Sequence, residues 1–112
     1  MGPYSQAVEA GSTLYVSGQV PLVPESGKVL EGGIREQTEQ CLFNVGAILQ
    51  EAGYDFSHVV KCTCLLSDMA NFKAMNEVYA TFFPADPPAR AAFAVRELPL
   101  GVLVEIECIA VK

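Results

Sequence analysis

The sequence predicts an α+β fold with the element order β-β-α-β-α-β-β, in which two helices pack on one face of a mixed sheet. Two segments, residues 34–52 and the segment that ends near Phe83, repeat apolar residues at helical spacing. Five shorter segments are alternating or continuously apolar, as strands are: residues 7–9, 14–20, 59–66, 91–95 and 102–110. Because the chain has 112 residues, we expect a single domain, residues 1–112.

The composition indicates more apolar surface than a monomer of this size covers. Hydrophobic residues make up 51% of the chain and charged residues only 18%. If two helices cover one face of the sheet, self-association is the simplest way to cover the other. The net charge is −6, with seven scattered basic residues. Since phosphate binding needs a concentrated basic patch, we expect neither nucleic acid nor an anionic membrane as a partner.

The N-terminal residues give no targeting signal. No apolar run approaches the ~20 residues of a membrane span. The segment from Met1 to Tyr4 lacks the basic and apolar regions of a signal peptide. We therefore expect a cytoplasmic protein, or one imported into a plastid or mitochondrion if a leader has been removed.

The cysteines are predicted to be buried and reduced, in a reducing compartment. They are Cys41, Cys62, Cys64 and Cys108, and none of their spacings is C-x-x-C. Two of them, Cys62 and Cys64, share one face of a predicted strand, which makes a bridge between them difficult. The single histidine, His58, has no partners at zinc-binding spacing and is expected on a surface loop.

The first two strands are expected to form an antiparallel hairpin. Alternation divides the second strand into two faces, one with Leu14, Val16, Gly18 and Val20 and the other with Tyr15, Ser17 and Gln19. Gly18 beside Ser17 has two interpretations. It marks a β-bulge, which is the simpler one, or it lets a ligand or another backbone approach closely.

A loop, a long helix and a central strand are predicted for the middle of the chain. Residues 21–32 are rich in turn residues and predict a surface loop. The helix over residues 34–52 lays its apolar stripe on the sheet, and Gly53 supplies its C-terminal stop. Residues 59–66 are almost continuously apolar, which predicts a strand buried on both faces.

The second helix is predicted to start at a cap formed by Ser67-Asp68. Its buried stripe consists of Phe72, Met75, Tyr79 and Phe82. Asn76 lies at the border of this stripe, where a polar amide needs hydrogen-bond partners. Asn76 therefore either pins a loop, which is the default, or contacts a ligand.

One arginine and two carboxylates stand out near the C-terminus. Pro87-Pro88 stiffens the backbone before Arg90, so the position of this arginine is well defined. In the last strand, Glu105 and Glu107 point to the same face. If residues 98–101 reverse the chain into a hairpin, that face lies near Arg90. The arginine and the carboxylates then form either a salt bridge, which the pattern alone favours, or a site.

Five short motifs, spread over nearly the whole chain, resemble those of the RidA (YjgF/L-PSP) family. They are Gly2-Pro3-Tyr4-Ser5-Gln6-Ala7, Val16-Ser17-Gly18-Gln19, Asn76-Glu77-Val78-Tyr79, Pro88-Ala89-Arg90 and Val104-Glu105-Ile106-Glu107-Cys108-Ile109-Ala110. Each motif alone is weak, and their order and spacing carry the resemblance. Many bacterial members have Ser-Cys after the arginine, whereas Ala91-Ala92 follows it here, which excludes thiol chemistry at that position.

The resemblance implies a chorismate-mutase-like fold and a homotrimer with clefts between its subunits. It implies hydrolysis of reactive 2-imino and enamine acids, such as 2-aminoacrylate, 2-iminopropanoate and 2-iminobutanoate, to 2-oxo acids and ammonia. Pyridoxal-phosphate-dependent dehydratases release these compounds, and the family carries no cofactor or metal of its own. Carried over by motif, the carboxylate-binding arginine is Arg90 and the water-activating acid is Glu105. The other residues that line the cleft are Tyr4, Ser17 and Asn76.

These residue types suit that chemistry. The planar fork of Arg90 binds a carboxylate bidentately and keeps its charge. We expect burial to raise the pKa of Glu105 and Arg90 to oppose the shift. We expect Glu107 to pair with a basic side chain at the centre or edge of the trimer. Two other functions remain open. One is a non-catalytic regulatory module that binds 2-oxo acids; the other is the endoribonuclease or translation inhibitor of the older family names, which the acidic charge balance disfavours.

Overall fold

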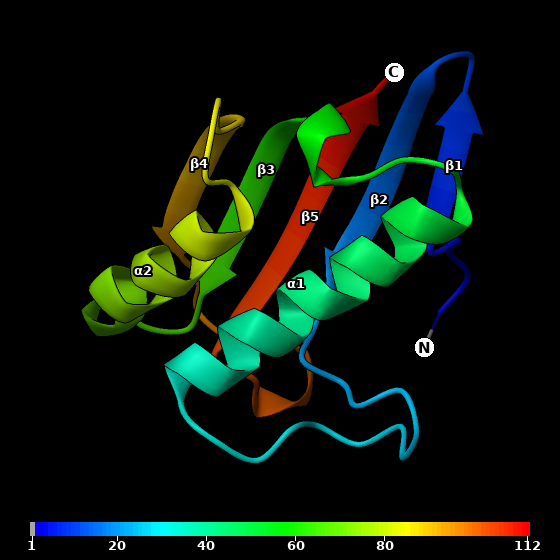
Figure 1. Cartoon of the computed structure of the whole chain (residues 1–112). Helices are drawn as coiled ribbons and strands as arrows, with labels where there is room; N and C mark the ends of the chain where they lie inside the picture. The colour runs from blue at the N-terminus through cyan, green and yellow to red at the C-terminus, as the bar shows by residue number, and fades with distance from the viewer. Residues whose placement is uncertain (1) are drawn as a thin grey trace.

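A five-stranded sheet forms one layer of the molecule and two helices form the other (Figure 1). The computed structural model describes residues 2–112. The strands and helices are β1 Ala7–Ala10, β2 Thr13–Gln19, α1 Ile34–Glu51, β3 Val59–Leu66, α2 Phe72–Phe82, β4 Ala89–Ala94 and β5 Val104–Val111. Their order confirms the predicted α+β fold and its β-β-α-β-α-β-β sequence of elements.

The strands lie side by side in the order β1-β2-β5-β3-β4, with β5 in the centre. β3 and β4 are parallel, and the other neighbours are antiparallel. The hairpin between residues 91–95 and the last strand, which was the condition for bringing Arg90 near the two glutamates, does not form, because β3 lies between β4 and β5. The crossover through α2 is the reason, since it returns the chain parallel to β3 at the edge of the sheet. Residues 98–101 instead carry the chain past β3 and include a short 3-10 turn, Pro99–Gly101.

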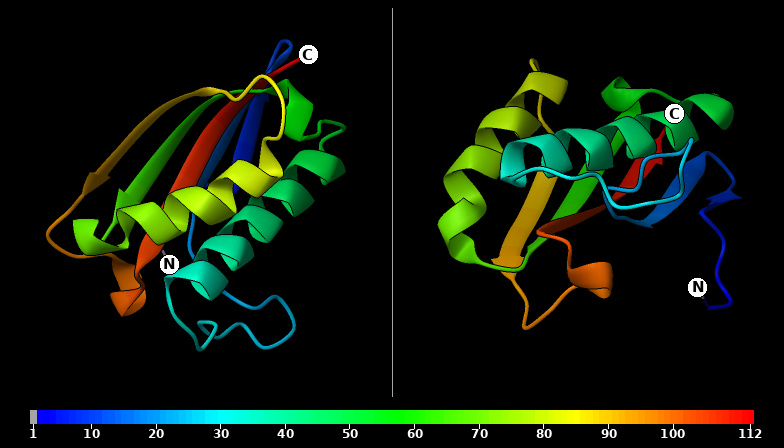
Figure 2. Two further views of the ribbon diagram at one scale, coloured as in Figure 1. Left: turned by 60° about the vertical axis from the view of Figure 1, so that its left-hand side comes forward. Right: turned by 90° about the horizontal axis from the view of Figure 1, so that it is seen from below.

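Both helices cover the same face of the sheet, and the hydrophobic core lies between the two layers (Figure 2). The largest fully buried side chains come from both helices, β3 and β5: Leu42, Leu49, Leu66, Met75 and Ile106. The predicted apolar stripes therefore do pack on the sheet. α1 ends just before Ala52 and Gly53, and the φ of 86° at Gly53 confirms its predicted role as a stop. In residues 2–112, neither helix is long and apolar enough to cross a membrane.

Two predictions about β3 and α2 need correction. Asp68 caps a separate 3-10 turn, Met69–Asn71, by accepting a hydrogen bond from the Ala70 N–H at 2.8 Å, and α2 follows this turn. One face of β3 is buried under the helices, but the residues of its other face are only half-buried: Lys61, Thr63 and Leu65. β3 is therefore not buried on both faces in a single chain, because no second layer covers that side of the sheet.

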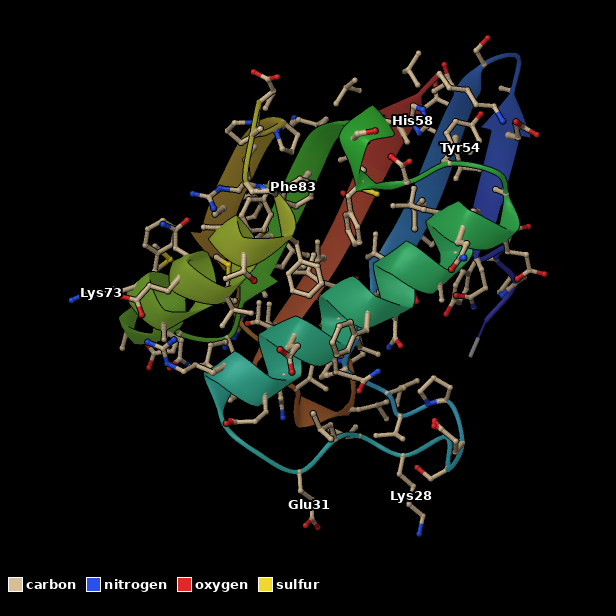
Figure 3. All side chains as sticks on the ribbon, viewed as in Figure 1. Lys28, Glu31, Tyr54, His58, Lys73 and Phe83 are labelled. Atoms are coloured by element: carbon tan, nitrogen blue, oxygen red, sulfur yellow. The ribbon has the colours of Figure 1, made fainter. Side chains whose placement is uncertain are left out.

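All four cysteines are free and buried, as predicted. Burial raises the pKa of each thiol, and that of Cys64 reaches about 12. These thiols therefore stay protonated and unreactive. His58 lies at the surface (Figure 3), in the short 3-10 turn Phe56–His58 rather than in an irregular loop. Its Nδ1 accepts a hydrogen bond from the Asp55 N–H at 3.0 Å.

The face of the sheet opposite the helices carries large apolar side chains that contact water. Strand alternation and pairing register place four of the most exposed ones there: Val8, Tyr15, Phe93 and Val111, which are 54%, 50%, 48% and 41% exposed. Two helices are too few to cover both faces, which is why this apolar area remains. We call this side the open face of the sheet.

Candidate active site

Arg90 lies on edge strand β4 and points toward the helix layer. It stands opposite Cys62 in the pairing register, and Cys62 belongs to the buried core. The Arg90 Nη1 donates a hydrogen bond to Asn76 Oδ1 at 2.6 Å. The guanidinium carbon lies 4.8 Å from the centre of the Tyr79 ring and 5.5 Å from that of Phe72. Asn76 thus binds the side chain of Arg90 in the same subunit. Neither of its two predicted roles, fixing a loop or contacting a ligand, is observed.

A cavity of about 400 Å³ opens beside this arginine. Its walls are the last turns of α2 and the approach to β4: Asn76, Tyr79, Ala80, Phe83, Pro87, Pro88 and Arg90. Phe83 marks the C-terminal end of α2 in Figure 3. Apart from Arg90 and Asn76, these walls are largely apolar. The cavity can therefore hold a small acid whose carboxylate meets the guanidinium.

A second cavity, of about 540 Å³, lies on the open face around Glu105. Its walls come from the N-terminal segment, β2, β5 and the turn before β5: Tyr4, Ser17, Gly18, Val20, Pro99, Glu105 and Glu107. As predicted, Glu105 and Glu107 share one face of their strand. This cavity gathers three of the predicted site residues, Tyr4, Ser17 and Glu105.

A β-bulge shapes the floor of the second cavity. Val16 pairs with Cys108 and Gln19 with Ile106, so the register shifts by one residue across Ser17-Gly18. The bulge reverses the alternation, and Gln19, rather than Gly18, turns toward the helix layer at 9% exposure. The prediction that Gly18 shares a face with Leu14 and Val16 is therefore wrong, and the predicted bulge is confirmed.

Gly18 is also the point of closest approach to Glu105. A Cβ built on Gly18 would lie only 2.0 Å from Glu105 Oε2 and 2.9 Å from its Cδ. Any side chain at this position would displace the carboxylate or the strand. The bulge and the missing side chain together give the Glu105 carboxylate its place. The atoms that approach Gly18 belong to the Glu105 side chain, rather than to the ligand or second backbone of the other interpretation.

Hydrogen bonds hold the N-terminal segment against the bulge. The Ser17 Oγ donates to the Ser5 carbonyl at 2.6 Å, and the Ser17 N–H donates to the Gln6 carbonyl at 2.9 Å. The buried Gln19 amide donates to the Ser17 carbonyl at 3.0 Å and to Gln6 Oε1 at 3.2 Å. The hydroxyl proton of Ser17 is therefore engaged, and its oxygen remains available as an acceptor. The same bonds keep Tyr4 at the rim of the cavity.

Arg90 and Glu105 do not meet within one chain. Neither belongs to an ion pair among residues 2–112. The salt bridge favoured by the sequence pattern is therefore wrong for a single chain, because Arg90 faces the helices and Glu105 faces the other way, with β3 between their strands. Burial is the main cause that raises the pKa of Glu105, and repulsion from Glu107 adds to it. Arg90 was expected to lower the pKa of Glu105, but it lies on the other side of the sheet and does not oppose this shift.

We expect Glu107→Gln to lower the pKa of Glu105, because it removes the like charge. A ¹³C NMR titration of the glutamate carboxyl carbons measures this shift directly. The pKa of Glu105 is raised in the folded state above its ordinary value of 4.5. Its contribution to stability is therefore complete below that pH and is lost as the pH rises through the folded-state pKa. In Glu107→Gln the loss of this stability should begin at the same pH and be complete at a lower pH than in the wild type.

The matched control for that titration is Glu31→Gln, in the exposed loop before α1 (Figure 3). It removes the same charge away from β5 and should leave the Glu105 titration in place. An unchanged midpoint in Glu107→Gln would contradict the electrostatic role of Glu107. A midpoint that moves equally in both variants would indicate only a change in net charge.

The predicted site residues thus form two groups on opposite sides of the sheet. Arg90 and Asn76 form one, and Tyr4, Ser17 and Glu105 form the other. The sequence did not identify Phe72 and Tyr79 as neighbours of Arg90, because both were assigned to the buried stripe of α2. Their positions four residues before and three residues after Asn76 were the available signal, since this spacing places all three on one helix face.

Comparison with known proteins gives the family. The whole chain, residues 1–112, matches the family model described as Endoribonuclease L-PSP. The chain belongs to the RidA (YjgF/L-PSP) family. This confirms the family resemblance that the five motifs carried.

Relatives in the RidA family share most of this chain. The mouse protein named 2-iminobutanoate/2-iminopropanoate deaminase is 54% identical over 112 residues, which cover 100% of this chain and 83% of the mouse protein. Arabidopsis thaliana Reactive Intermediate Deaminase A, chloroplastic, is 50% identical over 110 residues; these cover 98% of this chain and only 59% of that relative. A crystal structure of E. coli TdcF with bound serine superposes with a TM-score of 0.95 at 38% identity, covering 100% of this chain and 90% of TdcF.

Proposed function

We propose that this chain hydrolyses reactive 2-imino and enamine acids, such as 2-aminoacrylate, 2-iminopropanoate and 2-iminobutanoate, to 2-oxo acids and ammonia. Its relatives include deaminases with these names at about half identity over the full chain. The observation that carries the proposal is the guanidinium fork of Arg90, which forms no ion pair among residues 2–112, together with a carboxyl group, Glu105, whose pKa is raised. These are the two groups that an imino acid hydrolase needs.

The active site is completed by two subunits of a homotrimer. One subunit supplies Arg90 and Asn76 from its sheet edge, and its neighbour supplies Tyr4, Ser17 and Glu105 from its open face. Two features support this arrangement. The open face carries large apolar side chains that an assembly would bury. In addition, the charge of Arg90 meets no carboxylate among the described residues 2–112, so the guanidinium is available to a ligand at an interface.

The reaction begins with binding of the substrate carboxylate to Arg90 through two parallel hydrogen bonds. An enamine gains a proton at C3 and becomes the imine, whose protonated form is electrophilic at C2. Water adds to C2 while the Glu105 carboxylate takes its proton, giving a carbinolamine. The protonated Glu105 then returns that proton to the nitrogen. As ammonia leaves, the Glu105 carboxylate takes the hydroxyl proton and the C2–O bond becomes a carbonyl. Glu105 passes this proton to the departing ammonia, so one water is consumed and one 2-oxo acid and one ammonium ion are released.

The other residues of the cleft orient these partners. The Ser17 oxygen accepts a hydrogen bond from the attacking water, because its own proton is held by the Ser5 carbonyl. Tyr4 covers the rim of the same cavity. Since the protonated imine is already electrophilic, positioning and proton transfer suffice, and no side chain acts as a nucleophile.

The direct test couples the protein to a pyridoxal-phosphate-dependent threonine dehydratase, the class of enzyme that supplies the imine. Semicarbazide traps free imine, and the release of 2-oxobutanoate is followed at the same time. We expect the protein to speed 2-oxo acid formation and to lower the trapped fraction. No change in either would contradict hydrolysis. Binding of 2-oxobutanoate without acceleration would instead indicate a regulatory module. The assembly is tested by sedimentation, where a trimer has three times the 12.0 kDa mass of the chain.

RNA cleavage, which the description of the family model names, is poorly supported by this chain. Its net charge is −6, and its seven basic residues do not form a cluster in the sequence. Incubating RNA with the wild-type protein and with Arg90→Ala would reveal an intrinsic nuclease. Equal cleavage by both would point to contamination or to another site.

A further inference from the structure

The guanidinium of Arg90 is held entirely by neutral groups of α2. Its hydrogen-bond partner is the Asn76 amide oxygen, and two aromatic rings, Phe72 and Tyr79, lie within 5.5 Å of its central carbon. Both distances are within the range of a cation–π contact. The three α2 residues follow one helix face, so a single rigid element sets the position and plane of the fork. We call Asn76, Phe72 and Tyr79 the neutral cradle of Arg90, because they fix the position of the guanidinium without cancelling its charge.

Tyr79 is the more firmly placed of the two rings. It is 5% exposed and packs on Phe83 with ring centroids 4.8 Å apart and planes inclined by 38°. Its hydroxyl is buried, and among residues 2–112 only the Cys62 thiol, a weak hydrogen-bonding group, lies close enough to interact with it. The hydroxyl is thus directed toward a core cysteine, while the ring face lies against the Arg90 guanidinium.

We infer that Tyr79 is a positioning residue for Arg90, whose ring face holds the guanidinium where it can receive the carboxylate of a 2-imino or 2-oxo acid. The inference rests on the proposed function, because it assumes that Arg90 binds the substrate. A carboxylate in place of the ring would hold the fork as firmly, but it would compete with the ligand for the same N–H groups. The neutral cradle avoids this competition.

The test compares Tyr79→Leu, which removes the aromatic face, with Tyr79→Phe, which keeps it. The readout is the ratio of the dissociation constants of 2-oxobutanoate and its neutral amide, 2-oxobutanamide, measured by calorimetry on the assembled protein. In Tyr79→Leu we expect 2-oxobutanoate to bind about three- to thirtyfold more weakly, the range of a cation–π contact, with little change for the amide. The conservative variant Tyr79→Phe should restore the wild-type ratio.

Two further variants keep the test decisive if Tyr79→Leu folds poorly. Phe72→Leu removes the more distant ring at a half-buried position and should weaken carboxylate binding in the same direction by a smaller factor. Val45→Ala destabilises α1 at a core position that forms no part of the cradle, and should leave the ratio unchanged. In the wild type, ring currents should also shift the Arg90 Nε–H proton resonance upfield, and Tyr79→Leu should reduce that shift.

The outcomes separate this inference from the proposed function. If the wild type binds 2-oxobutanoate through Arg90 but does not accelerate imine hydrolysis, the proposed function fails while the cradle stands. If the wild type hydrolyses imines and Tyr79→Leu keeps both the binding ratio and the KM, the positioning role is overturned. A KM that rises in Tyr79→Leu while kcat stays within about twofold of the wild type supports the inference, because the ring then acts on carboxylate binding alone.

Discussion

Arg90→Ala should abolish imine hydrolysis and weaken 2-oxobutanoate binding by about thirtyfold to several thousandfold. Truncating one partner of a buried, hydrogen-bonded charge pair removes about 2–5 kcal/mol of binding free energy, and each 1.4 kcal/mol is a factor of ten. No other arginine or lysine lines the cavity beside Arg90, so no neighbour can replace it. The measurement is the dehydratase-coupled assay with semicarbazide, together with calorimetry.

The control for Arg90→Ala is Arg96→Ala, which removes the same type of side chain from an exposed position just after β4. Arg96→Ala should lower the semicarbazide-trapped fraction as the wild type does, and it should bind 2-oxobutanoate with the wild-type affinity. Both variants should sediment as the wild type does, because Arg90 forms no ion pair in the described part of the chain, residues 2–112, whose loss would unfold β4. If Arg90→Ala lowered the semicarbazide-trapped fraction as fully as the wild type, Arg90 would not be part of the active site.

Glu105→Gln should lower kcat by about 10²- to 10⁴-fold, the usual contribution of a general acid–base group. Glutamine has nearly the same shape but cannot take a proton from water or return it to nitrogen. Binding of 2-oxobutanoate should change much less, because in the proposed mechanism Arg90, not Glu105, binds the carboxylate of the ligand. Steady-state kinetics and calorimetry on the same preparation measure the two effects. A variant with the full wild-type rate would leave proton transfer to solvent and substrate.

Gly18→Ala tests the position of Glu105 without changing its chemistry. The added Cβ would stand 2.0 Å from Oε2 in the present geometry, so the carboxylate must move. We expect kcat to fall in the same direction as in Glu105→Gln. Gly27→Ala is the control for glycine replacement, since a Cβ there meets nothing within 4 Å, although its φ of 71° adds local strain in the loop. Unchanged kcat in Gly18→Ala would mean that the bulge does not set the active carboxylate.

Local patterns in the sequence carried much of the correct prediction. Apolar spacing identified both helices, and alternation placed Glu105 and Glu107 on one face of their strand. Gly53 was correctly assigned as a helix stop because a positive φ at a C-terminus is a property of one residue. The motifs that named Arg90, Glu105, Tyr4, Ser17 and Asn76 as candidates are also short and local, and the roles assigned to these residues stay predictions. Features that depend on neighbours in the chain were therefore within reach of the sequence.

Only the tertiary structure decided how these pieces face one another. Strand alternation has a period of two, so it says which residues share a face but not which strand lies beside it or which face the helices cover. The α2 crossover placed β4 beside β3, turned Arg90 toward α2 and left Glu105 on the opposite side. The bulge at Ser17-Gly18 then reversed the alternation of β2. Pairing and register depend on packing between distant segments. For this reason the sequence by itself named the candidate residues, and the fold decided that they lie in two groups on opposite sides of the sheet.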